Sequence, residues 1–503
     1  MTTYRFTDIT AQQALLVSPT DRIEFTGPAS AVTVVIEANV LVVLEGRSVE
    51  FGSGIYSISQ SHNLAFSDGS YLLIGDAADN RLAGGDGSDA FFGGSGLDTL
   101  LSGAGADLLQ GNAGGDSLAG EAGNDTIYGG KDSDVIATGD GDNFAQGNVG
   151  SDTIFGGAGR DTLLGGKDDD VIYSGGGINY INGNLGNDYL TVESNLQSTV
   201  LGEGGNDTIV AQYSSSRLYG GDGNDSISNG DASGLIYGEE GNDFIVSKGG
   251  TDSIFGGAGS DTIQDSGTGS HIDGGDGDDY VTALSLGYET INGGLGNDII
   301  YSTQWGEKTI YGDGGNDSIN TAAGTDRVYG GDGDDFLVDT DNDGDILSGG
   351  GGNDTLSGNG QIRYEGGDGD DVISTRFSGN YIYLGSGSDT IRIQGGLKSD
   401  LFYVDFVYDW ESNDNIEISD VLSHYGYISY SEIISNDRWD ARSQANEIIR
   451  SKGGIVAAQI GNDVYVFWDA NGTLSGAPIN ADGAMLLAGT SLSDLDRGNF
   501  NLA

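Results

Sequence analysis

The amino-acid sequence predicts an all-β fold in which very short strands stack into a flattened solenoid. The first observation is a gapless nine-residue repeat, which starts at Gly84 with GGDGSDAFF, GGSGLDTLL and SGAGADLLQ and is typical of solenoids. The second is the composition: 91 glycines, 3 prolines and no cysteine exclude collagen, a proline-rich linker and a disulfide scaffold. The third is one large apolar residue at the same place in each repeat, which supplies a thin continuous core.

Each repeat combines a turn with a strand. The segment GGxGxD is a turn whose glycines allow positive φ, and xUx is a strand in which only the large apolar residue U points inward. Two repeats make one coil, so successive turns fall on opposite edges of the solenoid and residues one coil apart are stacked neighbours. The inward residues of the first coils are Phe91, Leu100, Leu109, Leu118, Ile127 and Ile136.

The two edges differ in sequence. One edge, which we call the regular edge, carries an aspartate in every turn from Asp98 to Asp389. The opposite edge, which we call the degenerate edge, starts with complete turns, has Asn143 in place of an aspartate, and becomes irregular after Gly156, as in AQYSSSRLY and NGDASGLIY. One-residue insertions, as in ALSLGYETIN, also collect there. The regular edge therefore keeps an aspartate at a fixed position in each turn, whereas the turns of the degenerate edge vary in sequence and length.

The segments on either side of the repeats have a different character. Residues 1–75 are expected to form a β-rich N-terminal cap with strands in VTVVIE, NVLVVLE, SVEF and YLLI. The repeats then occupy residues 76–395. In residues 396–503, RWDARSQANEIIRSK predicts a helix that stops at Gly453, and GIVAAQI and VYVFW predict two strands around a short turn. This carboxyl-terminal segment is therefore expected to be small and mixed α/β.

The charge of the chain predicts bound cations. With 77 acidic and 20 basic side chains the formal net charge is −57, which repels nucleic acids and anionic membrane surfaces. The sequence holds no apolar run of the length that a membrane-spanning helix needs, so membrane insertion is not expected either. Aspartates repeated along one edge would face each other across one strand spacing, roughly 4.8 Å. Such a column requires cations, and hard divalent ions suit its oxygen ligands best.

The repeats carry a resemblance to a known family. GGAGSDTIQ, GGDGDDYVT and GGDGDDFLV resemble the nonapeptides of the RTX (hemolysin-type calcium-binding repeat) family of type I secreted proteins, over about residues 75–395. The resemblance implies a right-handed parallel β-roll that is disordered at low calcium. It also implies export from a Gram-negative bacterium by the type I secretion machinery, directed by an uncleaved signal in residues 396–503, and folding outside the cell or at its surface.

The resemblance further implies that the turn aspartates are calcium ligands. Together they are expected to hold roughly 18 Ca²⁺ ions, mostly between neighbouring turns of the regular edge. Asn143 and the later turns of the degenerate edge depart from the motif, and no ions are assigned to them. On the regular edge the expected ligands are Asp98, Asp116, Asp134, Asp152, Asp170, Asp188, Asp207, Asp225, Asp243, Asp261, Asp279, Asp298, Asp317, Asp335, Asp354, Asp371 and Asp389, and on the degenerate edge Asp89, Asp107, Asp125 and Asp161.

Catalysis is not expected. The sequence contains neither HExxH nor GxSxG, and its histidines, His62, His271 and His424, lie in unrelated segments. Residues 1–75 and 396–503 leave little room for a catalytic domain beside the roll. The alternative interpretation is a secreted carbohydrate-active enzyme or a soluble RTX calcium-binding or adhesion module.

An aromatic row indicates a surface for assembly. On one sheet the residue after U points outward yet is repeatedly aromatic, at Tyr128, Tyr219, Tyr237, Phe255, Tyr311, Tyr329 and Tyr383. Such a row either stiffens the sheet from within or marks a subunit interface. We expect a self-assembling extracellular scaffold, such as a surface layer, filament or biofilm matrix. Its partners would be further copies of the chain, joined head to tail or laterally, with cell-surface polysaccharide as a second candidate.

Overall fold

The structure is a computed structural model. It describes residues 2–18, 21–25, 29–36, 40–44, 47–60, 64–213, 215–341, 343–376, 379–393, 405–411, 413–418, 430–435, 455–460, 463–468, 483–487, 495 and 500–501. These residues fall into two compact units, residues 1–249 and residues 250–503, which are described in turn.

The described residues at the start of the first unit form two small sheets and three short helices around an apolar core. Strands β3, β4, β5 and β7 lie in the four segments predicted to form strands, whereas the helices were not predicted. Thr10 caps the first helix through a reciprocal pair of hydrogen bonds with Gln13. The elements are β1 (Thr3–Arg5), β2 (Arg22–Phe25) and β6 (Leu64–Phe66) in a parallel sheet, β3 (Thr33–Ile36), β4 (Val40–Leu44) and β5 (Arg47–Phe51) in an antiparallel sheet, and helices α1 (Ala11–Ala14), η1 (Ala29–Ala31) and α2 (Gly54–Gln60).

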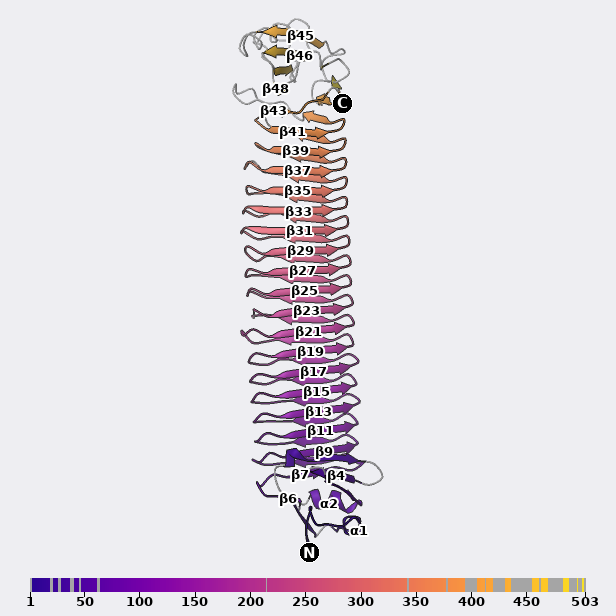
Figure 1. Cartoon of the computed structure of the whole chain (residues 1–503). Helices are drawn as coiled ribbons and strands as arrows, with labels where there is room; N and C mark the ends of the chain where they lie inside the picture. The colour runs from indigo at the N-terminus through magenta and orange to yellow at the C-terminus, as the bar shows by residue number, and fades with distance from the viewer. Residues whose placement is uncertain are drawn as a thin grey trace. The chain divides into compact units, whose positions relative to one another are not determined.

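The rest of the first unit is a roll of two parallel sheets, in which the strands of each coil lie over those of the coil before (Figure 1). We name the sheets by the parity of their strand numbers. The odd sheet contains β7 (Leu72–Ile74), β9 (Ala90–Ser95), β11 (Leu108–Ala113), β13 (Thr126–Lys131), β15 (Phe144–Val149), β17 (Thr162–Lys167), β19 (Tyr180–Leu185), β21 (Thr199–Gly204), β23 (Arg217–Asp222) and β25 (Leu235–Glu240). The even sheet contains β8 (Arg81–Ala83), β10 (Thr99–Leu101), β12 (Ser117–Ala119), β14 (Val135–Ala137), β16 (Thr153–Phe155), β18 (Val171–Tyr173), β20 (Tyr189–Val192), β22 (Thr208–Ala211), β24 (Ser226–Asn229) and β26 (Phe244–Ser247).

The second unit has the same two-sheet arrangement. Its odd strands are β27 (Ser253–Ala258), β29 (His271–Asp276), β31 (Glu289–Leu295), β33 (Lys308–Gly314), β35 (Arg327–Asp332), β37 (Ile346–Gly351), β39 (Arg363–Asp368), β41 (Tyr381–Ser386) and β43 (Asp405–Tyr408). Its even strands are β28 (Thr262–Asp265), β30 (Tyr280–Ala283), β32 (Ile299–Ser302), β34 (Ser318–Thr321), β36 (Phe336–Asp339), β38 (Thr355–Gly358), β40 (Val372–Thr375), β42 (Thr390–Ile393) and β44 (Asn415–Ile418).

Among the described residues, the carboxyl-terminal part of the second unit adds five strands. They are β45 (Tyr430–Ser435), β46 (Ile455–Ile460), β47 (Asp463–Trp468), β48 (Gly483–Leu487) and β49 (Phe500–Asn501). β46 and β47 are the two predicted strands, and they pair antiparallel as expected for a short turn. The helix predicted over residues 438–452 lies outside the described residues, as do His62 and His424. Among the described residues, no helix has the length and apolarity needed to cross a membrane.

The repeat explains the register and the core. Leu100 pairs with Leu118, two repeats later, and a one-residue insertion lengthens the coil where Ile291 pairs with Ile310. All six predicted inward residues are buried, at 0–1% exposed. The first glycine of each turn also faces inward: a Cβ on Gly129 would lie 2.3 Å from Asp134 Oδ2. Each coil thus buries few large apolar side chains, each of which contributes about 1.5–3 kcal/mol.

Candidate metal centres along the two edges

The turn aspartates of the regular edge form a continuous hydrogen-bonded column in the first unit. The backbone N–H of Asp98 donates to Asp116 Oδ1 at 2.8 Å, that of Asp116 to Asp134 Oδ1 at 2.7 Å, and so on to Asp243. The nonapeptide places each carboxylate directly above the previous one, because both follow the same glycine turn. One oxygen of each carboxylate therefore accepts the N–H of the aspartate one coil earlier and holds that coil in register.

The column of the second unit has the same geometry. It starts with the N–H of Asp261 donating to Asp279 Oδ1 at 2.7 Å and continues through Asp389. Asp389 in turn donates to Asp414 Oδ1 at 3.1 Å. Sequence reasoning missed Asp414 because 25 residues separate it from Asp389, which breaks the nine-residue period.

In most aspartates of the regular edge the second carboxylate oxygen is buried and without a hydrogen-bond donor. The aspartates are at most 2% exposed, so water does not reach the free oxygen. A buried anion without a partner is strongly unfavourable, and a column of them at strand spacing calls for cations between the turns. The regular-edge Oδ2 atoms in this state belong to Asp98, Asp116, Asp134, Asp152, Asp170, Asp188, Asp207, Asp225, Asp279, Asp298, Asp317, Asp335, Asp354, Asp371 and Asp389.

Burial raises the pKa of these carboxyl groups in the absence of cations. Desolvation is the main cause and the neighbouring aspartates add to it, so that the pKa of Asp134 and that of Asp170 reach about 8. For Asp207 and Asp279 the pKa is raised to about 7 by the same causes. A divalent cation would remove both causes by replacing the proton as the partner of the carboxylate.

These shifts predict how the cation-free chain responds to acid. Unfolded aspartates titrate near pH 4, so between about pH 4 and 8 the folded cation-free roll binds more protons than the unfolded chain, and its stability rises as pH falls. In a chelator, acidification from pH 8 to about 5 should therefore increase the strand signal in circular dichroism. The same acidification with saturating calcium should not. A chelated chain whose strand signal is unchanged over this range would contradict the prediction.

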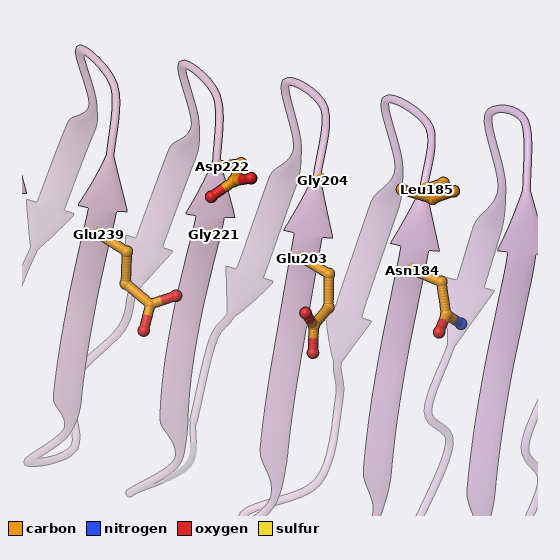
Figure 2. Close-up of a pocket in the computed structure, with 7 residues that line it drawn as sticks. All are labelled: Asn184, Leu185, Glu203, Gly204, Gly221, Asp222 and Glu239. Carbon is orange, nitrogen blue, oxygen red and sulfur yellow. The ribbon is translucent and has the colours of Figure 1, made fainter.

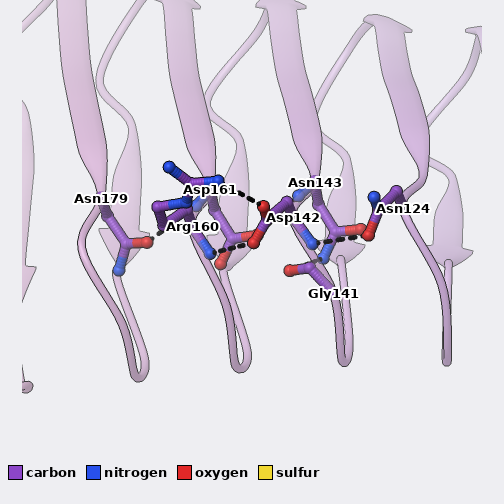
Figure 3. Close-up of polar contacts among 7 residues, drawn as sticks. All are labelled: Asn124, Gly141, Asp142, Asn143, Arg160, Asp161 and Asn179. Carbon is purple, nitrogen blue, oxygen red and sulfur yellow. Dashed lines mark hydrogen bonds and ion pairs between the residues drawn. The ribbon is translucent and has the colours of Figure 1, made fainter.

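The degenerate edge of the first unit keeps the hydrogen bonds but loses charge. Asp125 N–H donates to Asn143 Oδ1 at 2.8 Å. Asn143 N–H donates to Asp161 Oδ1, and Asp161 N–H to Asn179 Oδ1, each at 2.9 Å (Figure 3). The four predicted aspartates Asp89, Asp107, Asp125 and Asp161 are all buried in this column. Its turns carry an exposed ion pair between Arg160 and Asp142, with 3.0 Å between nitrogen and oxygen, which stabilises little.

The asparagines replace a cation as well as a carboxylate. Asn143 Nδ2 donates to the carbonyl of Gly141 at 3.1 Å, and Asn179 Nδ2 donates to the carbonyls of Ser174 and Gly176 at 3.1 Å each. Turn carbonyls that a metal ion would otherwise bind are thus satisfied by the amide nitrogen, while the amide oxygen continues the column. This geometry agrees with assigning no ion to these turns.

In the second unit a lysine occupies the aspartate position of the degenerate edge. Lys308 is 1% exposed, and its Nζ lies 2.6 Å from the carbonyl of Gly287, 3.2 Å from that of Ser285 and 3.6 Å from Glu289 Oε2. Carbonyls and a carboxylate around one positive charge form the environment that a calcium ion would need. The ammonium group therefore acts as a built-in cation.

Replacing Lys308 by methionine should destabilise the second unit. The substitution leaves the Glu289 carboxylate buried without its cation, and removing one partner of a buried pair costs about 3–5 kcal/mol. Urea denaturation in saturating calcium would measure the loss. The double variant K308M/E289Q, which removes both charges, should recover much of it. Equal stability of K308M and the unaltered chain would contradict this role.

On both sides of Lys308, the degenerate edge of the second unit carries buried carboxylates that sequence reasoning missed. Asp252, Asp326 and Asp345 stand at the turn position, and Asp265 and Asp339 end even strands; all are 1% exposed. Sequence reasoning assigned no ions to this edge after Asp161, whereas the structure buries carboxylates there. The missed signal was the spacing of Asp326 and Asp345, 19 residues apart, without the usual glycines.

A shallow acidic cavity of about 360 Å³ lies on the outer side of the regular edge in the first unit. Figure 2 shows Asn184, Glu203 and Glu239 on three odd strands, with the strand of Gly221 between those of Glu203 and Glu239. Burial and the nearby Glu203 raise the pKa of Glu239. The carboxylates of the lining are largely exposed to water, and the lining residues include neither a histidine nor a nucleophilic side chain. This cavity offers no constellation for catalysis.

Comparison with known proteins identifies the repeat. The family model described as RTX calcium-binding nonapeptide repeat matches residues 74–109, 101–136, 110–145, 137–172, 146–181, 164–194, 201–236, 229–263, 255–285, 287–303, 309–337, 339–361 and 363–391. Together these matches cover more than half of the chain. The comparison with individual curated proteins found no match.

Proposed function

Because the chain belongs to the RTX calcium-binding nonapeptide repeat family, we propose that it is a secreted protein that calcium folds outside the cell and that then assembles with its own copies into an extracellular scaffold. RTX repeats are typical of extracellular proteins secreted by Gram-negative bacteria, and their β-rolls are typical of non-enzymatic structural or adhesion modules. The observation that carries the proposal is the column of buried, unpartnered Oδ2 atoms along the regular edge.

Calcium ions would lie between successive turns of the regular edge. Each would take carboxylate oxygens from two stacked aspartates and carbonyl oxygens from the glycine turns, which together meet its need for 6–8 oxygen ligands. Roughly 18 such ions would carry about +36 against the formal charge of −57. The bound chain stays acidic, which keeps it soluble until it meets a complementary surface.

Export by the type I machinery explains why the fold depends on calcium. A chain that stays unfolded at the low calcium of the cytoplasm can pass through a one-step channel and fold on the other side. We assign the export signal to residues 396–503. In this proposal residues 1–75 act as the amino-terminal cap of the roll.

Exposed apolar side chains support assembly. Tyr288 is 73%, Leu286 67% and Trp305 66% exposed in the turns of the degenerate edge, and exposed apolar side chains that gather in this way mark interaction surfaces. On the odd sheet Tyr219 stacks on Tyr237, with ring centroids 5.1 Å apart. That stack shows that the aromatic row also acts within the chain, so the turns of the degenerate edge are the better candidates for a subunit interface.

Particle size tests the scaffold. In millimolar calcium the protein should form particles far larger than its 51.8 kDa chain, visible by light scattering and negative-stain electron microscopy. In excess chelator these particles should be absent. A calcium-loaded protein that stays monomeric at high concentration would overturn the scaffold and leave a soluble calcium-binding or adhesion module.

A further inference from the structure

Three carboxylates meet in one turn of the degenerate edge, away from the nonapeptide columns. Asp339 ends β36, Asp345 directly precedes β37, and Asp341 lies in the loop between them. One oxygen atom of each lies within 4.8 Å of the others. Three formal negative charges converge there, and the ion pairs of the described residues include none of the three.

Buried oxygens without partners point into this cluster. Asp339 and Asp345 are each 1% exposed, yet the Oδ2 atom of each is without a hydrogen-bond donor. Their other oxygens are used: Asp345 Oδ1 accepts the N–H of Asp326 at 2.7 Å, and Asp339 Oδ1 accepts the hydroxyl of Thr321 at 3.4 Å. The remaining oxygens are thus held in place by the neighbouring coil and unsatisfied, as expected of preorganised metal ligands.

The sequence of the loop matches a calcium-binding pattern that differs from the nonapeptide. Residues 339–345 read DTDNDGD, which contains the D-x-D-x-D-G core of calcium loops, where alternate carboxylates bind the ion and the glycine makes the sharp turn. Asp339 and Asp341 occupy the first two carboxylate positions of that core, whereas Asp343, at the third, is exposed, and Asp345 completes the cluster in its place. Gly344 has φ = +98°, a conformation that side chains disfavour. The GGxGxD motif, by contrast, supplies one carboxylate per turn and requires two stacked coils.

We infer that Asp339, Asp341 and Asp345 form a calcium site of their own, in which each supplies a carboxylate ligand. Its ligands are all oxygen atoms, which excludes a preference for soft metals. Calcium fits better than magnesium, because a loop closed by two fixed strands can give an irregular shell of many oxygens, whereas magnesium demands near-ideal octahedral geometry.

The surroundings explain why such a site lies at this coil. One coil earlier, Lys308 N–H donates to Asp326 Oδ1 at 2.8 Å, and the lysine charge compensates the carboxylates around it. Asp345 lies on the side of Asp326 away from that lysine, since the Asp326 N–H donates to it. A cavity of about 180 Å³ lies beside Asp339, and Thr340, Gly358, Thr375 and Arg376 also line it.

Native mass spectrometry of the calcium-loaded full-length chain tests the site. The variant D341A changes a half-buried side chain of the loop and should bind one calcium ion fewer than the unaltered chain. The matched control D231A, at an exposed aspartate in another turn of the degenerate edge, should bind the same number as the unaltered chain. Equal stoichiometry of a folded D341A and the control would overturn the site.

A second measurement uses the unaltered chain, in case D341A fails to fold. Hydrogen–deuterium exchange should show a peptide covering residues 339–345 becoming protected as calcium is added, with a midpoint distinct from that of regular-edge peptides. The same concentration of magnesium should give no such protection. Unprotected loop amides in saturating calcium, or equal protection by magnesium, would overturn the assignment. If regular-edge peptides stay unprotected while this loop responds, the proposed calcium column fails and the loop site stands.

Discussion

Removing calcium should unfold both rolls of the chain, with the loss of most of the strand signal in circular dichroism. At the strand spacing of roughly 4.8 Å, two neighbouring aspartates repel by about 3 kcal/mol at an effective dielectric constant of ~20. This repulsion recurs at every coil of the regular edge. It is as large as the contribution of one inward leucine or isoleucine, about 1.5–3 kcal/mol. The thin core therefore cannot hold the bare column together at neutral pH.

One part of the chain should resist chelation. The amino-terminal segment, residues 1–75, holds a core of its own, in which Phe25 stacks on Phe6 and on Phe66 with ring centroids 4.8 and 4.5 Å apart. Proteolysis in excess chelator should then degrade the rolls faster than this segment. Calcium restored in excess should bring the full strand signal back, whereas magnesium should not. Retention of the native strand signal in chelator at pH 8 would refute the calcium column.

The nonapeptide made the rolls predictable because each repeat encodes its own geometry. The inward position of Leu109 or Ile127 and the stacking of Asp116 on Asp134 follow from the period alone. Such features need no information about distant residues. The same reasoning placed the strands β46 and β47, because a short turn separates two apolar runs.

What the sequence did not reveal depends on neighbours one coil away. Lys308 looks like a stray surface lysine until the structure places it among the carbonyls of Ser285 and Gly287, 21 to 23 residues earlier. In the sequence, Asn143 looks like a lost calcium ligand. In the structure its side-chain oxygen continues the hydrogen-bonded column, and its side-chain nitrogen donates to the carbonyl of Gly141. The insertions of the degenerate edge shift the register, so these pairings do not follow from a fixed period.

The degenerate edge of the second unit should be needed for assembly but not for folding. Tyr288 and Trp305 are 73% and 66% exposed, so replacing both by serine removes little buried area from the isolated chain. At a subunit interface each large aromatic would instead contribute about 1.5–3 kcal/mol when covered. The variant Y288S/W305S should therefore lose large particles in electron microscopy and light scattering. Its calcium-dependent strand signal should match that of the unaltered chain.

A control on the regular edge tests whether that edge binds calcium while the degenerate edge alone mediates assembly. Leu295 is 62% exposed in a turn of the regular edge of the same unit, so L295S removes a comparable exposed apolar group where ions are expected. If only the degenerate edge meets other subunits, L295S should assemble normally and Y288S/W305S should not. Loss of assembly in both variants would mean that exposed apolar area on either edge drives association. Normal assembly of Y288S/W305S would show that assembly does not depend on the degenerate edge, because its two most exposed aromatic side chains would then be dispensable. The irregular turns would in that case be repeats that lost the motif without gaining a role in assembly.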